Sequence, residues 1–564
     1  MEGELTVHWT QWVPNKLLKN VQTLQKPSVR YGHATTSTGH QVVIHGGYNN
    51  KNQPTWMDDL WLFHRCSTSN EWEWTSVKGD GVQLIPEARY SHTLINLNAP
   101  KDMKSTTAAA TTLYLFGGDD GGHRHAGELM TDSKSGYKWG QYFNDVWRVD
   151  IVVHGDHLFK AKWMKMKTRS SLSEPSPRTS HSAVAMTHME SKRMVMVVFG
   201  GLTVARDVAS SSSSSSLMRP TLVDSNEVWW MIPSLSSLSD DNTARWKRWK
   251  QQNSATRGGG SVITSPEARH GHAATTSHHT MYVFGGQSHL RQSLLSDLWS
   301  WTAAGWSLLH KNKDDSSSGD DKRQDKMVPN GLLYAAMSNM RTGSVDSNEG
   351  ERLILHGGAF GCHPRCTTES TVWLWEIGTN VWTKGQVKKK TQVHVRGDIA
   401  NIGERRDNGM VVAGRSSQYH VKESKSMVPM HRYRHTMSSL LLLQGDASSS
   451  SVADSSAEKW LHVMFGGESY GAAEKYHNDL WFLEVMSASS KRTLKLLKGR
   501  GVEESSVDVF RVVGMLWSFV AVSFACVLCV GGARAAWKLI QKCCRKKTSF
   551  KKKTKKVAVS NCVH

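Results

Sequence analysis

Arginine and histidine recur together along this chain; arginine binds acidic groups and histidine is a frequent metal ligand. The pattern Pro-x-x-Arg-x-x-His occurs five times, and its histidines are His33, His92, His181, His272 and His435. Ligands that converge on one metal ion should break a repeat, whereas these histidines occupy one repeat position. The pattern therefore favours a structural role, in which the Arg and His side chains satisfy polar groups between neighbouring strands.

The segment Cys-His-Pro-Arg-Cys, from Cys362 to Cys366, is a second candidate site. Two thiolates and an imidazole could hold zinc, but a fourth ligand is not evident and the spacing is not that of a zinc finger. A disulfide within the loop and two free thiols are the alternatives. The sequence contains no glycine-rich phosphate loop, no Gly-x-Ser-x-Gly and no His-Glu-x-x-His. It therefore predicts no catalytic residue, no cofactor and no metal site.

These candidate residues belong to a repeated unit of short apolar segments. Each unit has an apolar run that ends in two glycines, which permit close backbone approach at a strand end. The glycines are Gly46, Gly47, Gly117, Gly118, Gly200, Gly201, Gly285, Gly286, Gly357, Gly358, Gly466 and Gly467. A second run follows, mostly with the pattern Asp/Glu-apolar-Trp, and its tryptophans are Trp61, Trp147, Trp229, Trp299, Trp373 and Trp481. Most units end with a further tryptophan.

The repeat explains an unusual composition, in which 23 Trp exceed both the 12 Tyr and the 13 Phe. Four short strands per unit, repeated six times without helical periodicity, predict an all-β, six-bladed β-propeller over residues 5–486. The units begin near residues 27, 86, 175, 266, 329 and 429, with polar inserts between several strands. The sixth unit lacks its last tryptophan. The N-terminal segment, which carries Trp9 and Trp12, is therefore predicted to supply that strand and close the ring.

This combination of motifs closely resembles the kelch repeat. The chain is therefore similar to the kelch-repeat β-propeller family, and it would be a membrane-anchored member. The fifth unit departs from the pattern, because Leu332 and Ala335 replace its Arg and His. The resemblance implies that partners bind near one mouth of the central channel, close to the start of the inner strands. The repeated arginines would then form a basic ring suited to an acidic peptide. These candidate binding residues are Arg30, Arg89, Arg178, Arg269 and Arg432.

An uncharged segment and a basic tail follow the repeats. Residues 512–533 carry no charge, and as a helix these 22 residues would span about 33 Å, enough to cross a bilayer. Of the net charge of +21 on 564 residues, residues 534–564 contribute +11, from eleven Lys and Arg and no acid. Basic residues beside a membrane segment attract anionic lipid headgroups. The charge therefore indicates a membrane surface as partner of the tail, and no nucleic acid.

The same flanks predict the orientation of the segment. The positive-inside rule places the C-terminal tail in the cytoplasm and the propeller on the lumenal or extracellular side, joined by a stalk over residues 487–511. The first 25 residues contain no core of a secretory signal. Either the natural start is missing, which we favour, or the propeller is cytosolic. Cys543 and Cys544 are candidate palmitoylation sites, with unmodified thiols as the alternative.

The sequence thus predicts a single-pass membrane protein that presents a kelch-like propeller as a protein-interaction platform. No enzymatic activity is expected. The alternative hypothesis is a propeller enzyme with a metal or carbohydrate site at the channel mouth.

Overall fold

The computed structural model describes residues 6–13, 25–51, 53–66, 71–79, 84–98, 111–121, 141–154, 158–168, 174–188, 191–204, 222–234, 242–250, 265–311, 328–340, 351–360, 367–387, 428–442, 459–469 and 475–486. All of them belong to the first of two compact units, Met1–Ala488. The predicted stalk, membrane segment and basic tail lie outside the described residues, as do Cys362, Cys366, Cys543 and Cys544. In the part that is described, no helix is long and apolar enough to cross a bilayer.

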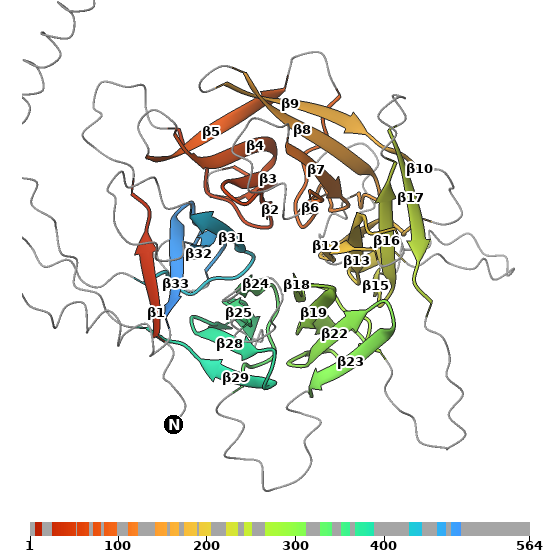
Figure 1. Cartoon of the computed structure of the whole chain (residues 1–564), viewed down its shortest axis with the longest axis vertical. Coiled ribbons are helices and arrows are strands. Elements are labelled where there is room, and N and C mark those ends of the chain that lie inside the picture. Colours follow the sequence, from red (N-terminus) through yellow and green to blue (C-terminus); the bar gives the residue numbers. More distant parts are fainter. Residues whose placement is uncertain are drawn as a thin grey trace, which may run out of the picture. The chain divides into compact units, whose positions relative to one another are not determined.

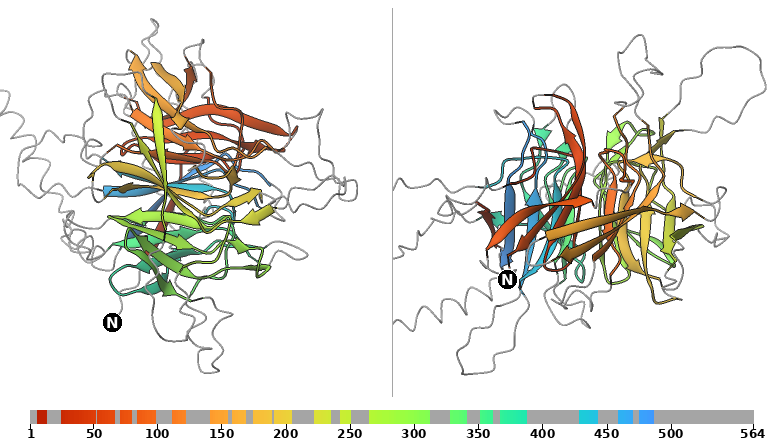
Figure 2. Two further views of the ribbon diagram at one scale, coloured as in Figure 1. Left: turned by 90° about the vertical axis from the view of Figure 1, so that its right-hand side faces the viewer. Right: turned by 90° about the horizontal axis from the view of Figure 1, so that it is seen from above.

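The described strands form six antiparallel sets of four that stand side by side around a centre (Figure 1). We call each set a blade and number the blades in chain order, beginning with the set that contains β2. Within a blade, the four strands follow one another from the centre of the ring to its periphery. Figure 2 shows from two further sides how the sheets stand next to one another. The described part of the chain is therefore an all-β propeller.

Each blade has an inner, a second, a third and an outer strand. The inner strands are β2 (Ala34–Ser37), β6 (Thr93–Asn96), β12 (Ser182–Thr187), β18 (Ala273–Ser277), β24 (Ala336–Met340) and β31 (Thr436–Leu442). The second strands are β3 (Val42–Asn49), β7 (Thr111–Phe116), β13 (Met194–Phe199), β19 (Thr280–Phe284), β25 (Arg352–His356) and β32 (Lys459–Phe465). The third strands are β4 (Thr55–Arg65), β8 (Val146–His154), β16 (Val228–Pro233), β22 (Leu298–Thr302), β28 (Val372–Glu376) and β33 (Leu480–Met486).

The outer strands are β5 (Trp72–Gly79), β9 (Leu158–Lys165), β17 (Thr243–Arg248), β23 (Gly305–His310), β29 (Val381–Lys384) and β1 (Thr6–Gln11). Short additional strands pair beside them or near the centre. These are β10 (Lys167–Thr168), β11 (Arg178–Thr179), β14 (Leu202–Val204), β15 (Leu222–Asp224), β20 (Gln287–Ser288), β21 (Ser293–Leu294), β26 (Ala359–Phe360), β27 (Thr367–Thr368) and β30 (Gln386–Val387).

The second strand of each blade is mostly apolar because both of its faces are covered. In β13 the sequence is MVMVVF, and five of these six residues are buried. The runs end in Gly-Gly because the next blade leaves no room for a side chain. A Cβ on Gly46, where φ is +65°, would lie 2.7 Å from the backbone oxygen of Arg89 and 2.8 Å from the His92 ring. The same contact joins blade six to blade one, between Gly466 and His33.

The N-terminal strand β1 completes blade six, as expected from the sequence. It pairs antiparallel with β33 and places Trp9 opposite Leu483. This is the register of the last tryptophan in the other five blades. Apolar side chains of blades one and six, including Phe63 and Phe465, then form one cluster. Trp9 rather than Trp12 therefore takes the final position of the repeat.

A closed circle of six backbone hydrogen bonds links the blades at the end where the inner strands begin. Each blade contributes the residue two positions before its inner strand, and its amide donates to the equivalent carbonyl of a neighbouring blade at 2.6–3.1 Å. In order, these residues are Gly32, Arg434, Tyr334, Gly271, Ser180 and Ser91. All six have positive φ, which is strained for the four that are not glycine. We call this circle and the side chains around it the channel mouth.

Candidate functional site

The arginine of each repeat is buried within its own blade and paired with an acid. In blade one, Arg30 Nη1 and Nη2 donate to the two carboxylate oxygens of Asp59, at 2.6 and 2.8 Å. Nη1 also donates to the carbonyl oxygen of Gly46 at 3.0 Å, and the Trp61 indole N–H donates to Asp59 at 2.6 Å. The acid, the glycine and the tryptophan of the repeat are therefore partners of one guanidinium.

The same unit recurs in four more blades. Its members are Arg89, Asp145 and Trp147; Arg178, Glu227 and Trp229; Arg269, Asp297 and Trp299; and Arg432, Asp479 and Trp481. All five arginines are 0% exposed. The predicted basic ring of Arg30, Arg89, Arg178, Arg269 and Arg432 is thereby corrected, because carboxylates neutralise these guanidinium groups inside the blades. The geometry supports the structural interpretation instead.

Burial and hydrogen bonding act in opposite directions on the carboxylates of this unit. Burial raises the pKa of Asp59, but the hydrogen bonds from Arg30 and Trp61 and the Arg30 charge outweigh it, so that the pKa lies below its usual value. The pKa values of Asp145 and Asp479 are lowered for the same reasons. These carboxylates therefore remain ionised at neutral pH.

The histidines of the repeat lie between blades. His33 Nε2 of blade one is 2.7 Å from Thr436 Oγ1 of blade six, and His181 Nε2 of blade three is 3.1 Å from Thr93 Oγ1 of blade two. Burial, with a further contribution from the nearby arginine, lowers the pKa of both histidines to about 3. Neutral imidazoles that contact the neighbouring blade fit the structural role expected for them.

Blade five lacks the whole charged unit and not its arginine alone. Leu332 takes the place of the arginine and is 1% exposed, while Thr371 stands two residues before Trp373, where other blades have the acid. Leu332 and Trp373 pack in one apolar cluster. Because both charges are absent together, blade five leaves no buried charge of this unit unpaired. Both replacements are visible in the sequence, but their pairing is visible only in the structure.

The two positions between the Arg and His of each motif belong to the channel mouth, and they differ from blade to blade. In blade order the residues are Tyr31 and Gly32, Tyr90 and Ser91, Thr179 and Ser180, His270 and Gly271, Leu333 and Tyr334, and Tyr433 and Arg434. Sequence reasoning overlooked them because it compared what the repeats share. The available signal was variation at two fixed positions inside an otherwise regular motif.

Tyrosine gathers at the mouth, mainly where blades six, one and two meet. Of the nine tyrosines among the described residues, seven lie there: Tyr31, Tyr48, Tyr90, Tyr142, Tyr334, Tyr433 and Tyr476. Tyr31 stacks on Tyr476 and meets Tyr48 edge-on, with ring centroids 5.8 and 5.3 Å apart. Tyr334 reaches across the circle from blade five, so that its hydroxyl lies 3.1 Å from Ser180 Oγ of blade three. The mouth therefore presents a largely aromatic surface.

Arg434 lies among these rings. Its guanidinium carbon is 4.2 Å from the ring centroid of Tyr334 and 5.4 Å from that of Tyr31, and it is partly exposed. Within the described residues, Arg434 has no ion pair or side-chain hydrogen bond, and its Nε is buried without a partner. Arg432, two residues earlier, donates to both carboxylate oxygens of Asp479. The charge of Arg434 is thus available to a ligand, whereas that of Arg432 is not.

Asp119 is a buried carboxyl group at the edge of the aromatic surface. Burial raises its pKa to about 6, although hydrogen bonds from the Thr179 hydroxyl and the Gly121 amide act in the opposite direction. The distance from Thr179 Oγ1 to Asp119 Oδ2 is 2.6 Å. This carboxyl group therefore changes its charge just below neutral pH.

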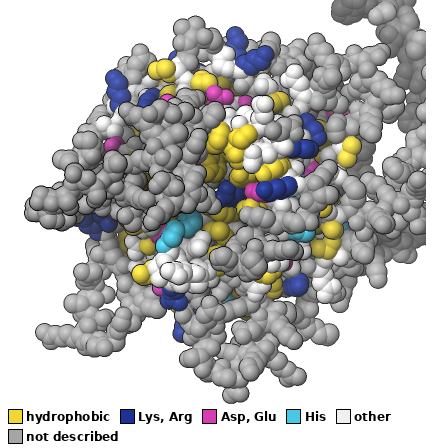
Figure 3. Space-filling model, turned by 180° about the vertical axis from the view of Figure 1, so that it is seen from behind, with side chains coloured by type: hydrophobic (Ala, Val, Ile, Leu, Met, Phe, Trp, Pro, Cys, Tyr) yellow, Lys and Arg dark blue, Asp and Glu magenta, His cyan; other side chains and the backbone are white. Residues whose placement is uncertain are grey.

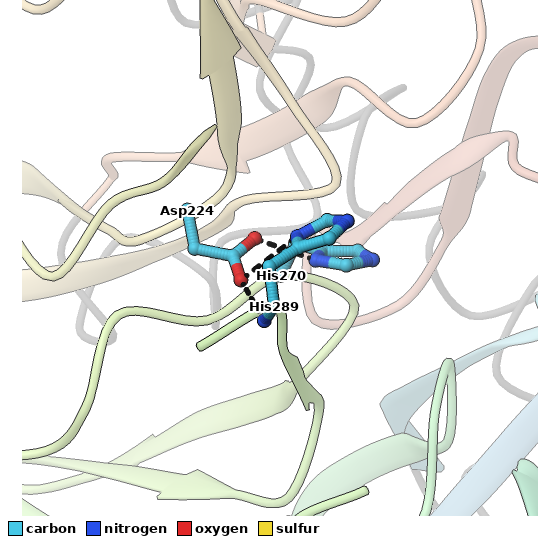
Figure 4. A group of neighbouring side chains, drawn as sticks. All are labelled: Asp224, His270 and His289. Atoms are coloured by element: carbon cyan, nitrogen blue, oxygen red, sulfur yellow. Dashed lines mark hydrogen bonds and ion pairs between the residues drawn. The ribbon is translucent and has the colours of Figure 1, made fainter. Parts of the chain in front are cut away.

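A second polar cluster joins blades three and four and consists of Asp224, His270 and His289 (Figure 4). Asp224 Oδ1 lies 2.7 Å from His270 Nδ1, and Asp224 Oδ2 lies 3.0 Å from His289 Nδ1. The two imidazole rings stack, with centroids 5.0 Å apart. Burial raises the pKa of Asp224, but hydrogen bonds from both histidines outweigh it and the net shift is downward. The cluster can offer two nitrogen atoms and a carboxylate oxygen to a cation.

On the face of the molecule shown in Figure 3, basic, acidic, histidine and hydrophobic side chains come together near the middle. The variety of chemistry there contrasts with the regular interior.

The fold is that of a β-propeller, and its repeated unit resembles the kelch repeat. No family model matches the chain. It is 23% identical over 300 residues to human host cell factor 1, a match that covers 46% of this chain and 12% of that protein. It is 21% identical over 284 residues to human host cell factor 2, covering 48% and 29%, and 22% identical over 300 residues to the Drosophila melanogaster host cell factor, covering 46% and 16%.

The matched regions thus amount to less than a third of the length of these curated relatives. Among solved structures, the chain is similar to that of YjhT, with 13% identity and a TM-score of 0.42. That match covers 82% of this chain and 99% of YjhT.

Proposed function

We propose that this protein is a single-pass membrane protein with a six-bladed, kelch-type propeller. The channel mouth of the propeller binds acidic side chains of a protein or peptide partner. The observation that carries the proposal is Arg434, a cation among tyrosine rings that forms no ion pair or side-chain hydrogen bond in the described part of the structure. We propose no catalytic role for the mouth.

The composition of the mouth suits recognition of a protein. Tyrosine and arginine are enriched at the centres of protein interfaces, because they combine a large contact area with directional hydrogen bonds. The Arg434 guanidinium lies over the ring of Tyr334 and near that of Tyr31, which restricts its orientation before a ligand arrives. A carboxylate can then accept two hydrogen bonds from one guanidinium.

The interior of the propeller supports this assignment by its neutrality. Each buried arginine of the repeat already has a carboxylate at hydrogen-bond distance, as between Arg269 and Asp297 at 2.7 Å. A ligand gains nothing from these charges because they are compensated and inaccessible. Attraction for an acidic partner must therefore come from groups outside the repeated unit, and Arg434 is such a group.

A binding experiment with the full chain tests the role of Arg434. Immobilised protein is offered a library of random peptides, and the retained peptides are sequenced. We expect enrichment of Asp and Glu on the unmodified chain and loss of that enrichment with Arg434→Ala. The control is Arg193→Ala, which removes an exposed arginine in the turn between β12 and β13, at the other end of the inner strands. Equal enrichment with both variants would contradict the proposal.

The membrane part of the proposal rests on residues 512–533 and on the basic residues that follow them. In this arrangement the tail lies in the cytoplasm, its lysines contact anionic lipid headgroups, and the propeller is lumenal or extracellular. Protease treatment of intact microsomes tests the orientation. The propeller should be protected and the tail digested, whereas digestion of the propeller would place it on the cytosolic side.

A further inference from the structure

The cluster of Asp224, His270 and His289 is distinct from the aromatic surface and has a different chemistry. The two histidines are separated from Asp224 by 46 and 65 residues in the chain and meet it only because blades three and four are neighbours. Asp224 ends β15, His270 lies three residues before β18, and His289 directly follows β20. Three segments from two blades therefore place three metal-ligand side chains together.

We propose that Asp224, His270 and His289 form a binding site for a divalent transition-metal ion of the zinc class. Each side chain offers one ligand atom, and the three atoms all lie within 4.8 Å of one another. Ligands about 2.0–2.2 Å from a tetrahedral zinc ion are about 3.3 Å apart. Because the nitrogen-to-oxygen distances are 2.7 and 3.0 Å, a small outward movement of both rings would admit the ion.

The ligand types favour zinc and its chemical neighbours over other cations. Imidazole nitrogen suits Zn²⁺, Cu²⁺ and Ni²⁺, whereas Ca²⁺ and Mg²⁺ prefer sites made of oxygen atoms alone. Two nitrogens and one carboxylate also match the three-ligand sites in which zinc keeps a fourth position open. Among the described residues, this is the group of three whose ligand atoms approach closely enough for a metal ion.

The burial of the three side chains agrees with such an open site. The side chains of Asp224 and His270 are 4% and 8% exposed, and that of His289 is 51% exposed. Two ligands are thus fixed within the fold, and the third lies at the surface. The backbone amide of His289 donates to Asp224 Oδ2 at 2.7 Å, which fixes the exposed ligand relative to the buried carboxylate. The open side can then accept water or a group of a partner.

The cluster also breaks the repeat, as ligands of one ion should. At the position of His270, the other blades have Tyr31, Tyr90, Thr179, Leu333 and Tyr433. Asp224 pairs with Leu202, the residue that directly follows the Gly-Gly pair of blade three. The residues that pair with the equivalent position in blades two and six are Tyr142 and Tyr476. An acid and a histidine therefore replace the usual residues at the junction of blades three and four, where both can bind the same ion.

Zinc titration of the full chain by calorimetry, after treatment with a chelator, tests this proposal. The matched pair of variants is His289→Ala and His279→Ala, since both remove an exposed histidine of blade four. We expect His279→Ala to bind Zn²⁺ like the unmodified chain. His289→Ala should lose one binding event or weaken it at least tenfold. Identical titrations of the two variants would overturn the proposal.

Cobalt provides a second readout that does not depend on affinity. Co²⁺ bound by two imidazoles and a carboxylate in a four-coordinate site absorbs visible light more strongly than hydrated Co²⁺. We expect this absorption in the unmodified chain and in His279→Ala, and its loss in His289→Ala and His270→Gln. Absorption that persists in both of the latter variants would place the metal elsewhere. The outcome is independent of peptide binding at Arg434, because no residue is shared.

Discussion

The interior of the propeller and its channel mouth follow opposite rules. Inside the blades, the same arginine, acid and tryptophan recur five times, and the charges cancel within each unit. At the mouth, two positions per blade vary among Tyr, Gly, Ser, Thr, His, Leu and Arg. The difference shows that repetition marks the parts that hold the ring together. Variation at fixed positions marks the parts that can acquire a ligand.

Removal of the closing strand should have the largest effect on the interior. Deletion of residues 1–14 removes β1, and with it Trp9, a buried tryptophan whose loss alone costs about 3–5 kcal/mol. Thermal unfolding should begin at a lower temperature and lose its cooperativity. The matched pair Trp9→Ala and Trp12→Ala refines the test, because Trp12 is only partly buried and should cost less. An unchanged midpoint after the deletion would contradict closure by β1.

Arg269→Ala should destabilise the fold by about 3–5 kcal/mol, because it leaves the buried carboxylate of Asp297 without its partner. Denaturant unfolding measures this change. The double variant Arg269→Leu with Asp297→Thr copies blade five, where Leu332 and Thr371 occupy these positions. It should recover a substantial part of the lost stability. A double variant no more stable than Arg269→Ala would show that leucine and threonine cannot replace the buried ion pair.

Stability should also fall as the pH is lowered from 7 towards 4. Burial lowers the pKa of His33, His45, His181 and His356 to about 3. In the unfolded chain these groups take up a proton near pH 6.5, so the unfolded state binds more protons below that pH and folding loses free energy. Each such histidine contributes about 1.4 kcal/mol per pH unit below 6.5. Denaturation midpoints measured from pH 7 to 4 provide the check, and a flat profile would count against neutral buried histidines.

The smallest effect on stability is expected at the mouth. Tyr334→Phe removes the hydroxyl that meets Ser180 but keeps the ring beside Arg434. Unfolding free energy should change by about 1 kcal/mol or less, the usual contribution of one hydrogen bond. Unfolding of this variant in parallel with Arg269→Ala gives the comparison directly. A loss as large as that of Arg269→Ala would show that the mouth is part of the framework.

Much of the framework could be predicted from the sequence, because it is repeated. The Gly-Gly ends and the spacing of the tryptophans indicated the strands, and the missing last tryptophan indicated that the N-terminal segment closes the ring. For the repeated arginines, the sequence favoured a structural role but left ligand binding open. Whether Arg89 faces a partner or Asp145 depends on which acid lies opposite, and these two residues are 56 positions apart.

The candidate sites at the mouth escaped prediction for a related reason. Arg434 lies inside a motif that drew attention to Arg432 and His435, and the rings that surround it come from blades one and five. Asp224 follows a serine-rich insert and has no sequence feature that links it to His289. Sites assembled from different blades require the order of the blades around the ring, which no local pattern contains.

Arg432 and Arg434 give the most direct test of the central claim. The two arginines are only two residues apart, but Arg432 belongs to the interior of the propeller and Arg434 to the channel mouth. Unfolding free energy and retention of acidic peptides are measured for Arg432→Ala and for Arg434→Ala in the full chain. We predict that Arg432→Ala loses about 3–5 kcal/mol of stability. Arg434→Ala should keep its stability and lose the peptides. Unfolding of Arg434→Ala, or unchanged peptide retention by it, would contradict the division between framework and mouth.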